Sequence, residues 1–131
     1  MITVAELDAL ARARLDDARA LLAAGRVDGA TYLCGYSVEI ALKARICRTL
    51  SWQAFPSTRK EFEGLASFRT HDLDLLLRLS GKEADIKLNH FATWNTVVVW
   101  DPESRYRAIG TVTAADAQAM ITAADALLSA L

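Results

Sequence analysis

Apolar residues recur three and four positions apart along the first fifty residues, and this period predicts two helices. Thr3 opens a capping-box pattern, so the first helix is expected over about 4–24, where Gly25 ends it. After two further residues, Asp28 is expected to cap a second helix that reaches about residue 50. So short a link predicts that the two helices pack antiparallel as a hairpin.

The remaining chain predicts a loop and three further helices. Residues 50–69 contain proline, glycine and scattered aromatics, which indicate a loop with one short helical turn at 58–62. Helices are expected at 70–80 with Thr70 as the cap, at about 82–99, and from Thr113, whose capping-box partner is Asp116. The run TVVVW at 96–100 also fits a strand, but no second strand pattern is available to pair with it, so we favour a helix or an extended edge. These patterns predict an all-α fold, an up-and-down bundle of four to five helices.

The second predicted helix is apolar around most of its circumference, which is typical of a central helix packed against several others. One face of it nevertheless carries Tyr32, Tyr36, Glu39 and Lys43 at helical spacing. This stripe has two interpretations. Either Glu39 and Lys43 pair with each other at the bundle surface, or the stripe lines a functional groove.

Composition and charge narrow the class of protein. The chain has 131 residues, 53% of them hydrophobic, which is enough for one core and predicts a single domain over 1–131. The formal net charge of −1 argues against a dedicated polyanion-binding module. A local basic cluster formed by Lys43, Arg45, Arg48, Arg59 and Lys60 fits either a binding patch or a solvated face.

Cys34 and Cys47 lie on one predicted helix, with Cα atoms about 20 Å apart, so they are expected to be free thiols. With no CxxC pair and no histidines clustered near them, the sequence predicts no metal site and no cofactor. The N-terminal residues do not form a signal peptide, and no apolar run approaches membrane-spanning length. We therefore expect a cytoplasmic protein with no membrane partner.

Three segments carry a resemblance to a known family. They are ALLAAGRVDGATYLCGYSVEIALKARI at 20–46, THDLDLLLRL at 70–79 and WDPESRYR at 100–107. In this order they resemble the HEPN domain family. The resemblance implies an all-α bundle, commonly a homodimer, that is either a ribonuclease toxin or the noncatalytic companion of a minimal nucleotidyltransferase in a toxin–antitoxin-like pair. It also implies likeness to the helical domain of antibiotic-modifying nucleotidyltransferases, which helps to bind nucleotide or substrate.

The spacing of arginine and histidine separates these two roles. Ribonuclease members of the family carry an arginine, four to six intervening residues and then a histidine. Here Arg69 precedes His71 with one residue between them, and Arg78 lies far ahead of His90. We therefore expect a noncatalytic companion or a nucleotide-binding or substrate-binding module first, a ribonuclease acting as a homodimer second, and a purely structural dimerisation module third.

The residues expected to form a binding site come from three places in the chain. They are Glu39 and Lys43 on the second helix, Arg69, His71 and Asp72 at the start of the third, and Arg105 and Tyr106 after Trp100. Arginine and lysine can hold the phosphates of a nucleotide or RNA, and an aromatic ring can stack on a base. In the ribonuclease alternative, His71 is the general acid-base, and Arg69 or Arg105 stabilises the phosphate. In the structural alternative, Glu39, Lys43, Arg105 and Tyr106 form a polar network that pins the second helix to the loop.

Overall fold

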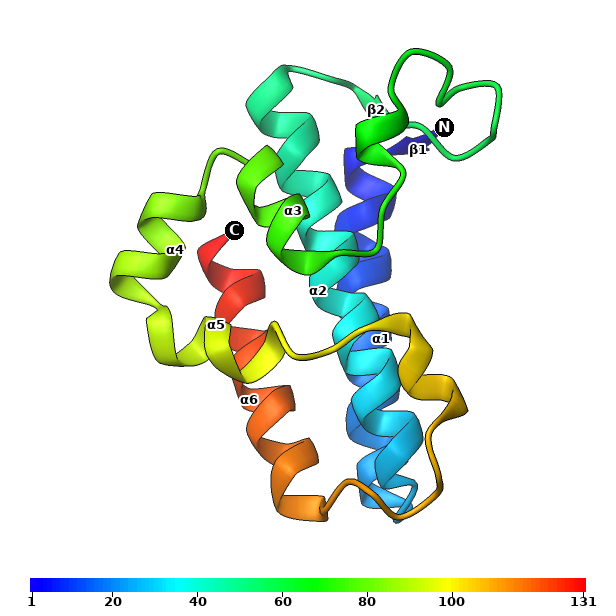
Figure 1. The fold of residues 1–131 in the computed structure, drawn as a ribbon, viewed down its shortest axis with the longest axis vertical. Coiled ribbons are helices and arrows are strands. Elements are labelled where there is room, and N and C mark those ends of the chain that lie inside the picture. Colours follow the sequence, from blue (N-terminus) through cyan, green and yellow to red (C-terminus); the bar gives the residue numbers. More distant parts are fainter.

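The computed structural model describes the backbone of residues 1–131 and every side chain except those of residues 104 and 105. The elements in chain order are β1 (Ile2–Thr3), α1 (Val4–Ala23), α2 (Val27–Leu50), β2 (Ala54–Phe55), the 3₁₀ turn η1 (Ala66–Phe68), α3 (Leu73–Leu79), α4 (Glu83–Asn89), α5 (Phe91–Val97), the 3₁₀ turn η2 (Pro102–Tyr106) and α6 (Ala114–Ala130). The all-α bundle is confirmed. Its long helices α1, α2 and α6 run side by side, and the short helices α3, α4 and α5 cover one flank (Figure 1).

The hairpin of α1 and α2 forms as the local sequence predicts. The capping box of Thr3 and Glu6 is present, and Gly25 adopts a φ of 76° just beyond the end of α1. The amides of Gly25 and Arg26 donate to the carbonyls of Leu22 and Leu21, at 3.0 and 2.8 Å, which is the Schellman pattern that closes a helix. The antiparallel pairing then follows from the short link.

Asp28 does not cap α2, and that prediction was wrong. The helix begins at Val27 with Arg26 in the cap position and no side-chain cap. The carboxylate of Asp28 is instead bonded to the backbone of a distant loop, because the Gly110 amide donates to its Oδ2 at 3.0 Å. A cap residue is recognisable only from its immediate neighbours, and here the partner is 82 positions away.

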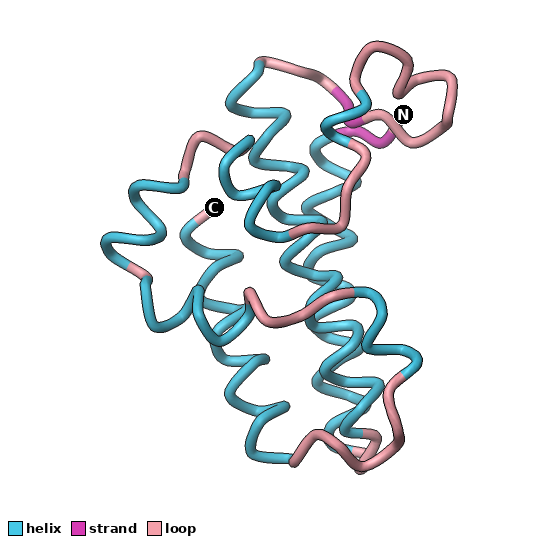
Figure 2. Tube along the Cα trace, viewed as in Figure 1, coloured by secondary structure: helices cyan, strands magenta, loops and turns pink.

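The central position of α2 is confirmed. This helix packs against α1, α3 and α6, and buried residues occur around most of its circumference. The buried residues of α2 are Ala30, Cys34, Gly35, Ser37, Val38, Glu39, Ala41, Leu42, Ala44, Ile46 and Cys47. The tube trace shows α1 and α2 running alongside each other as the two longest helices (Figure 2). Among the described residues, no helix is both long enough and apolar enough to cross a membrane.

Two boundaries in the second half differ from the prediction. The third helix begins at Leu73 and is capped by Asp72, whose Oδ1 accepts from the Leu75 amide at 3.1 Å, while Thr70 lies outside it. The predicted helix over 82–99 is split at His90, whose φ of −133° ends α4 and starts α5. The run at 96–100 leaves the helix after Val97 and is not a strand.

The 50–69 segment is more ordered than a plain loop. Residues Ala54 and Phe55 pair antiparallel with Thr3 and Ile2, a two-residue ladder that the sequence analysis did not predict. The Phe62 amide donates to the Thr58 carbonyl at 3.1 Å, which gives the expected turn at 58–62. Aromatic rings of this segment pack on each other and close that end of the bundle, with 4.9 Å between the ring centroids of Trp52 and Phe68.

Candidate functional site

A buried carboxylate joins three of the residues that the sequence analysis selected. The Oε1 atom of Glu39 accepts from the Lys43 ammonium at 2.8 Å and lies 2.9 Å from Nδ1 of His71. Glu39 is 2% exposed, whereas the His71 side chain is 58% exposed. The pairing of Glu39 with Lys43 is thus confirmed, but its predicted position at the bundle surface was wrong, because Glu39 is buried where the start of α3 packs on α2.

Local structure explains why His71 reaches this carboxylate. The Thr70 hydroxyl oxygen accepts from the Asp72 amide at 3.0 Å, and Asp72 in turn caps α3. This tight turn holds His71 just ahead of the helix, facing α2. At the other end of α3, the Thr49 hydroxyl donates to the Ser80 carbonyl at 2.5 Å. α3 is therefore fixed to α2 at both ends.

The second oxygen of the Glu39 carboxylate, Oε2, is buried and has no hydrogen-bond partner among the described residues. Burying a carboxylate oxygen without a donor is costly. The ion pair with Lys43 and the contact with His71 therefore have to hold this charge in place. The arrangement is rigid and suits a structural or positioning role for Glu39.

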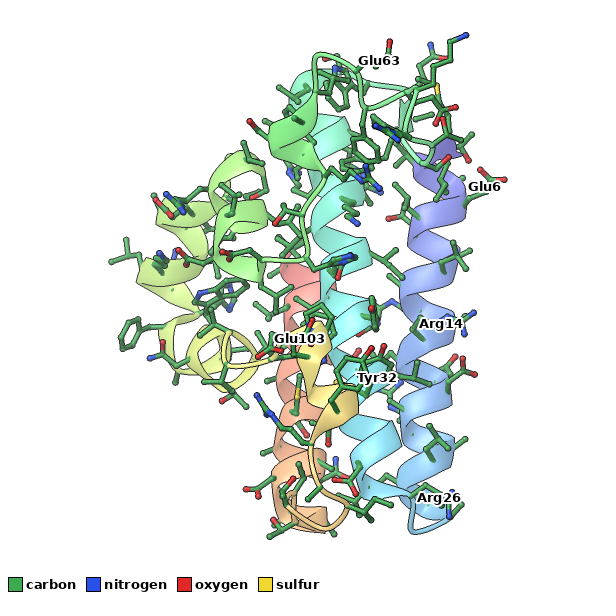
Figure 3. The ribbon with its side chains drawn as sticks, turned by 45° about the vertical axis from the view of Figure 1, so that its right-hand side comes forward. Glu6, Arg14, Arg26, Tyr32, Glu63 and Glu103 are labelled. Carbon is green, nitrogen blue, oxygen red and sulfur yellow. The ribbon has the colours of Figure 1, made fainter. Side chains whose placement is uncertain are left out.

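The other predicted site residues do not join this cluster in one place. Asp72 is the cap of α3, and the Arg69 side chain is exposed just before it. Tyr106 is exposed on η2, the segment that crosses α2 where Tyr32 lies (Figure 3). The side chain of Arg105 lies outside the described residues. Glu39 contacts His71 at the start of α3, and the network of Glu39 and Lys43 with Arg105 and Tyr106 stays a prediction.

An aromatic wall extends from His71 along α2. The Tyr36 ring lies edge-on to both His71 and Trp100, with centroid separations of 6.3 and 4.9 Å. Trp100 lies directly on Gly35, where an added Cβ would come within 2.1 Å of the indole ring. Its Nε1 donates to the Tyr32 carbonyl at 3.2 Å. The indole is therefore fixed by contact and by hydrogen bonding.

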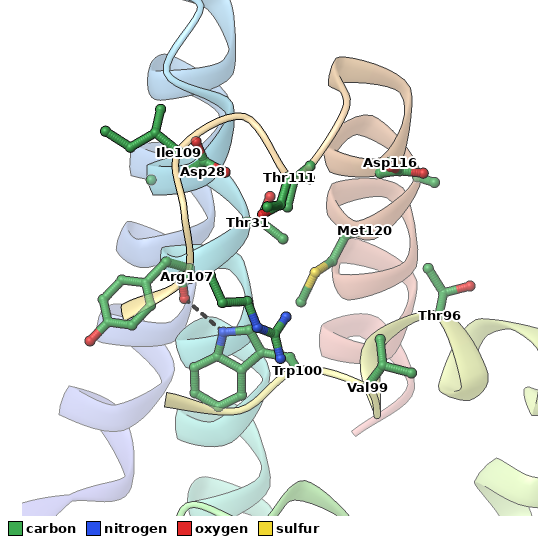
Figure 4. A pocket seen from close by; sticks show the side chains of 14 residues that line it. Asp28, Thr31, Thr96, Val99, Trp100, Arg107, Ile109, Thr111, Asp116 and Met120 are labelled. Atoms are coloured by element: carbon green, nitrogen blue, oxygen red, sulfur yellow. Dashed lines mark hydrogen bonds between the residues drawn. The ribbon is translucent and has the colours of Figure 1, made fainter. Parts of the chain in front are cut away.

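A pocket of about 500 Å³ opens on the other side of Trp100. Its walls come from the first turns of α2, the end of α5, the segment 107–112 and the start of α6. Arg107 and Met120 reach toward each other from opposite walls beside Trp100 (Figure 4). Its volume falls in the range of roughly 300–1,000 Å³ typical of small-molecule sites.

Each charged residue of this pocket is already engaged within the protein. Asp28 accepts from the Gly110 amide at 3.0 Å, and Arg107 donates to Asp101 at 3.3 Å. Asp116 accepts from the Thr113 amide at 3.2 Å, and hydrogen bonds from Thr113 lower the pKa of this carboxyl below its usual value. A ligand in this pocket would therefore meet apolar walls and polar groups whose hydrogen-bonding capacity is partly used.

A smaller cleft of about 370 Å³ lies next to His71 and is lined by Asp72, Val98–Pro102 and Leu73. Trp100 separates this cleft from the larger pocket and lines both. No group of three or more metal-ligating side chains gathers within the described part of the chain.

Sequence reasoning did not find the pocket. Its walls come from four segments far apart in the chain, and the predicted cap role of Asp28 concealed its real contact with 107–112. One signal was available in Gly35, because a glycine inside a buried helix often marks a close approach by another group.

Comparison of the chain with family models, with curated proteins and with solved structures finds no match.

Proposed function

We propose that this protein is a noncatalytic, HEPN-type companion of a minimal nucleotidyltransferase and binds nucleotide or substrate in the pocket beside Trp100. The proposal takes the partner and its toxin–antitoxin-like setting from the resemblance. It takes the binding role from the structure's preformed pocket. A cytoplasmic location and a homodimer belong to the same proposal.

The observation that carries the proposal is the position of Trp100. Two of the three segments that resemble the family meet at this residue, because its indole lies on Gly35 and its Nε1 donates to Tyr32. The third segment is adjacent, since the Tyr36 ring contacts both Trp100 and His71. Two of the three segments thus contribute walls to a small-molecule pocket, and the third borders the smaller cleft that Trp100 also lines.

The polar cluster supports a noncatalytic role. Glu39 is occupied by Lys43 and His71 and links two helices. The arginine–histidine spacing of the ribonuclease members is absent from the sequence.

The partner is tested by purifying the tagged native protein from its own cells and identifying what remains bound. Recovery of a nucleotidyltransferase in near-equal amount is the expected result. The untagged strain is the control for adhesion to the resin. Recovery of RNA or ribonucleoprotein with no such enzyme would contradict the companion role.

One observation favours the ribonuclease as a second candidate. The Glu39 carboxylate orients His71 through Nδ1, while the half-exposed ring borders a cleft, as a general acid-base requires. In that case purified protein cleaves RNA, His71→Ala abolishes cleavage, and His90→Ala, at the junction of α4 and α5, does not. Absence of cleavage by the native protein removes this candidate.

A further inference from the structure

The charges that line the pocket beside Trp100 are unfavourable for a phosphate group. Asp28 and Asp116 contribute two carboxylates, and Arg107 contributes one guanidinium, so these three side chains sum to a formal charge of −1. The guanidinium is already paired with Asp101. A phosphate entering here would meet net repulsion and would compete with an existing ion pair.

The uncharged groups of the pocket favour a flat ring. Trp100 and Tyr32 are among the lining residues, and Met120 contributes a polarisable thioether from α6. Stacking on such surfaces is available to any planar base and needs no charge. The pocket lies between the first turns of α2 and the start of α6 (Figure 4).

The polar groups offer both kinds of hydrogen bond to the edge of such a ring. The Thr31 hydroxyl donates to the Val27 carbonyl at 2.9 Å, which leaves its oxygen as an acceptor. Asp28 and Asp116 each use one carboxylate oxygen within the protein, so the other can accept. Arg107 has N–H groups beyond the one that donates to Asp101. A nucleobase carries matching donors and acceptors on one edge.

We propose that this pocket receives the uncharged base of a nucleoside or nucleotide and leaves any phosphate outside. The inference deepens the proposed function and rests on it for the nucleotide-like class of ligand. It reverses the expectation that basic residues of this protein bind phosphate. Selectivity then depends on the ring and its edge groups.

The first test titrates the purified protein with the four ribonucleosides, their monophosphates and inorganic pyrophosphate, using isothermal calorimetry. At least one nucleoside is expected to bind with a dissociation constant in the millimolar range or below. Its monophosphate should bind no more tightly than the nucleoside, and pyrophosphate should give no binding heat. The proposal is overturned if no nucleoside binds at its solubility limit. It is also overturned if the monophosphate or pyrophosphate binds about tenfold more tightly than the nucleoside.

Two sets of variants place the binding in this pocket. Ala119→Trp fills the space from an exposed position of α6 that lines the pocket, and should weaken the nucleoside about tenfold or more. Ala126→Trp, at an exposed position two turns further along α6, is the matched control and should leave binding unchanged. Unchanged binding by Ala119→Trp would overturn the proposal by placing the ligand elsewhere.

Charge exclusion is tested separately. Asp28→Asn keeps an oxygen for the Gly110 amide but removes a negative charge, so it should raise the ratio of monophosphate affinity to nucleoside affinity about threefold or more. Equal effects on both ligands would overturn the exclusion of phosphate. Because these titrations use the isolated protein, nucleoside binding without a nucleotidyltransferase partner refutes only the companion role. A partner recovered without nucleoside binding refutes this inference and leaves the companion role in place.

Discussion

Gly35 is the residue on which the position of Trp100 depends most directly. Gly35→Ala would place a Cβ within 2.1 Å of the indole, so the ring must move and the wall of the pocket moves with it. We expect a loss of about 1–3 kcal/mol in the free energy of unfolding, measured by urea denaturation. Gly29→Ala is the control, because its Cβ would meet Leu21 at an ordinary 3.4 Å and the change favours the helix. Equal stability of the two variants would contradict the close packing.

The burial of Cys34 and Cys47 should make both thiols unreactive in the folded protein. Burial raises the pKa of the Cys34 thiol to about 12 and raises that of Cys47 as well, and neither side chain is accessible. We expect neither thiol to react with Ellman's reagent at pH 8 in the native protein, and both to react in guanidinium chloride. Rapid reaction before unfolding would mean that α2 is less buried than described.

At this scale the sequence predicted pairs that are close along the chain and missed those that are distant. The i, i+4 pair of Glu39 and Lys43 was predictable from helical spacing. The contact of Glu39 with His71, 32 positions away, was not, because it depends on how α3 packs on α2. The same reason explains why Asp28 was mistaken for a cap.

The contacts of Glu39 between α2 and α3 should contribute to the free energy of unfolding. Glu39→Gln removes the charge that holds Lys43 and His71 but keeps a side chain of similar size, so the loss is expected to be about 1–3 kcal/mol by urea denaturation. Glu83→Gln, in an exposed pair with Lys87 on α4, should change stability little. A stable Glu39→Gln protein with altered nucleoside binding would instead place Glu39 in the ligand site.

The start of α6 should be sensitive to acid. Hydrogen bonds from Thr113 lower the pKa of Asp116, so the folded state binds this proton less readily than the unfolded state. The stabilisation is therefore fully present above about pH 4 and is lost as pH falls through the lowered native pKa. We expect Asp116→Asn to lower the melting temperature at pH 7 and to match the native protein in strong acid. In a Thr113→Ala background, the effect of Asp116→Asn at pH 7 should be smaller.

Helix boundaries show where local signals stop being sufficient. The hairpin of α1 and α2 was predicted because Thr3 and Gly25 carry strong end signals. The break at His90 carried no glycine or proline, so periodicity alone continued the helix through it. The pairing of Ile2 with Phe55 was missed because a two-residue ladder has no sequence pattern.

Over the whole molecule, the pocket depends on segments that no local rule brings together. Asp28 on α2 holds Gly110, and Arg107 is held by Asp101, so the segment 107–112 is fixed across the gap between α2 and α6. The bundle itself was predictable from amphipathic helices, which bury one face whatever their order. The space left between them was not predictable, because it depends on side chains such as Trp100 that fill the bundle unevenly.

The outer flank of α4 and α5 is the surface through which we expect the proposed homodimer to form. The inner sides of α4 and α5 are buried in the core through Ile86, Trp94 and Val97. The side chains of Leu88 and Phe91, on the same two helices, are 82% and 62% exposed. Large apolar side chains exposed on the same flank are candidate contacts between molecules. We expect the native protein to sediment as a dimer at micromolar concentration and the double variant Leu88→Glu, Phe91→Glu to sediment as a monomer with unchanged helical circular dichroism.

The matched control for this surface is Ile109→Glu, an exposed apolar position on the segment 107–112 rather than on α4 or α5. It should leave the dimer intact if α4 and α5 form the interface, and disrupt it if the pocket rim does. A native protein that stays monomeric at high concentration would refute the dimer altogether. The nucleoside titrations would still stand in that case, because every described residue of the pocket comes from a single chain.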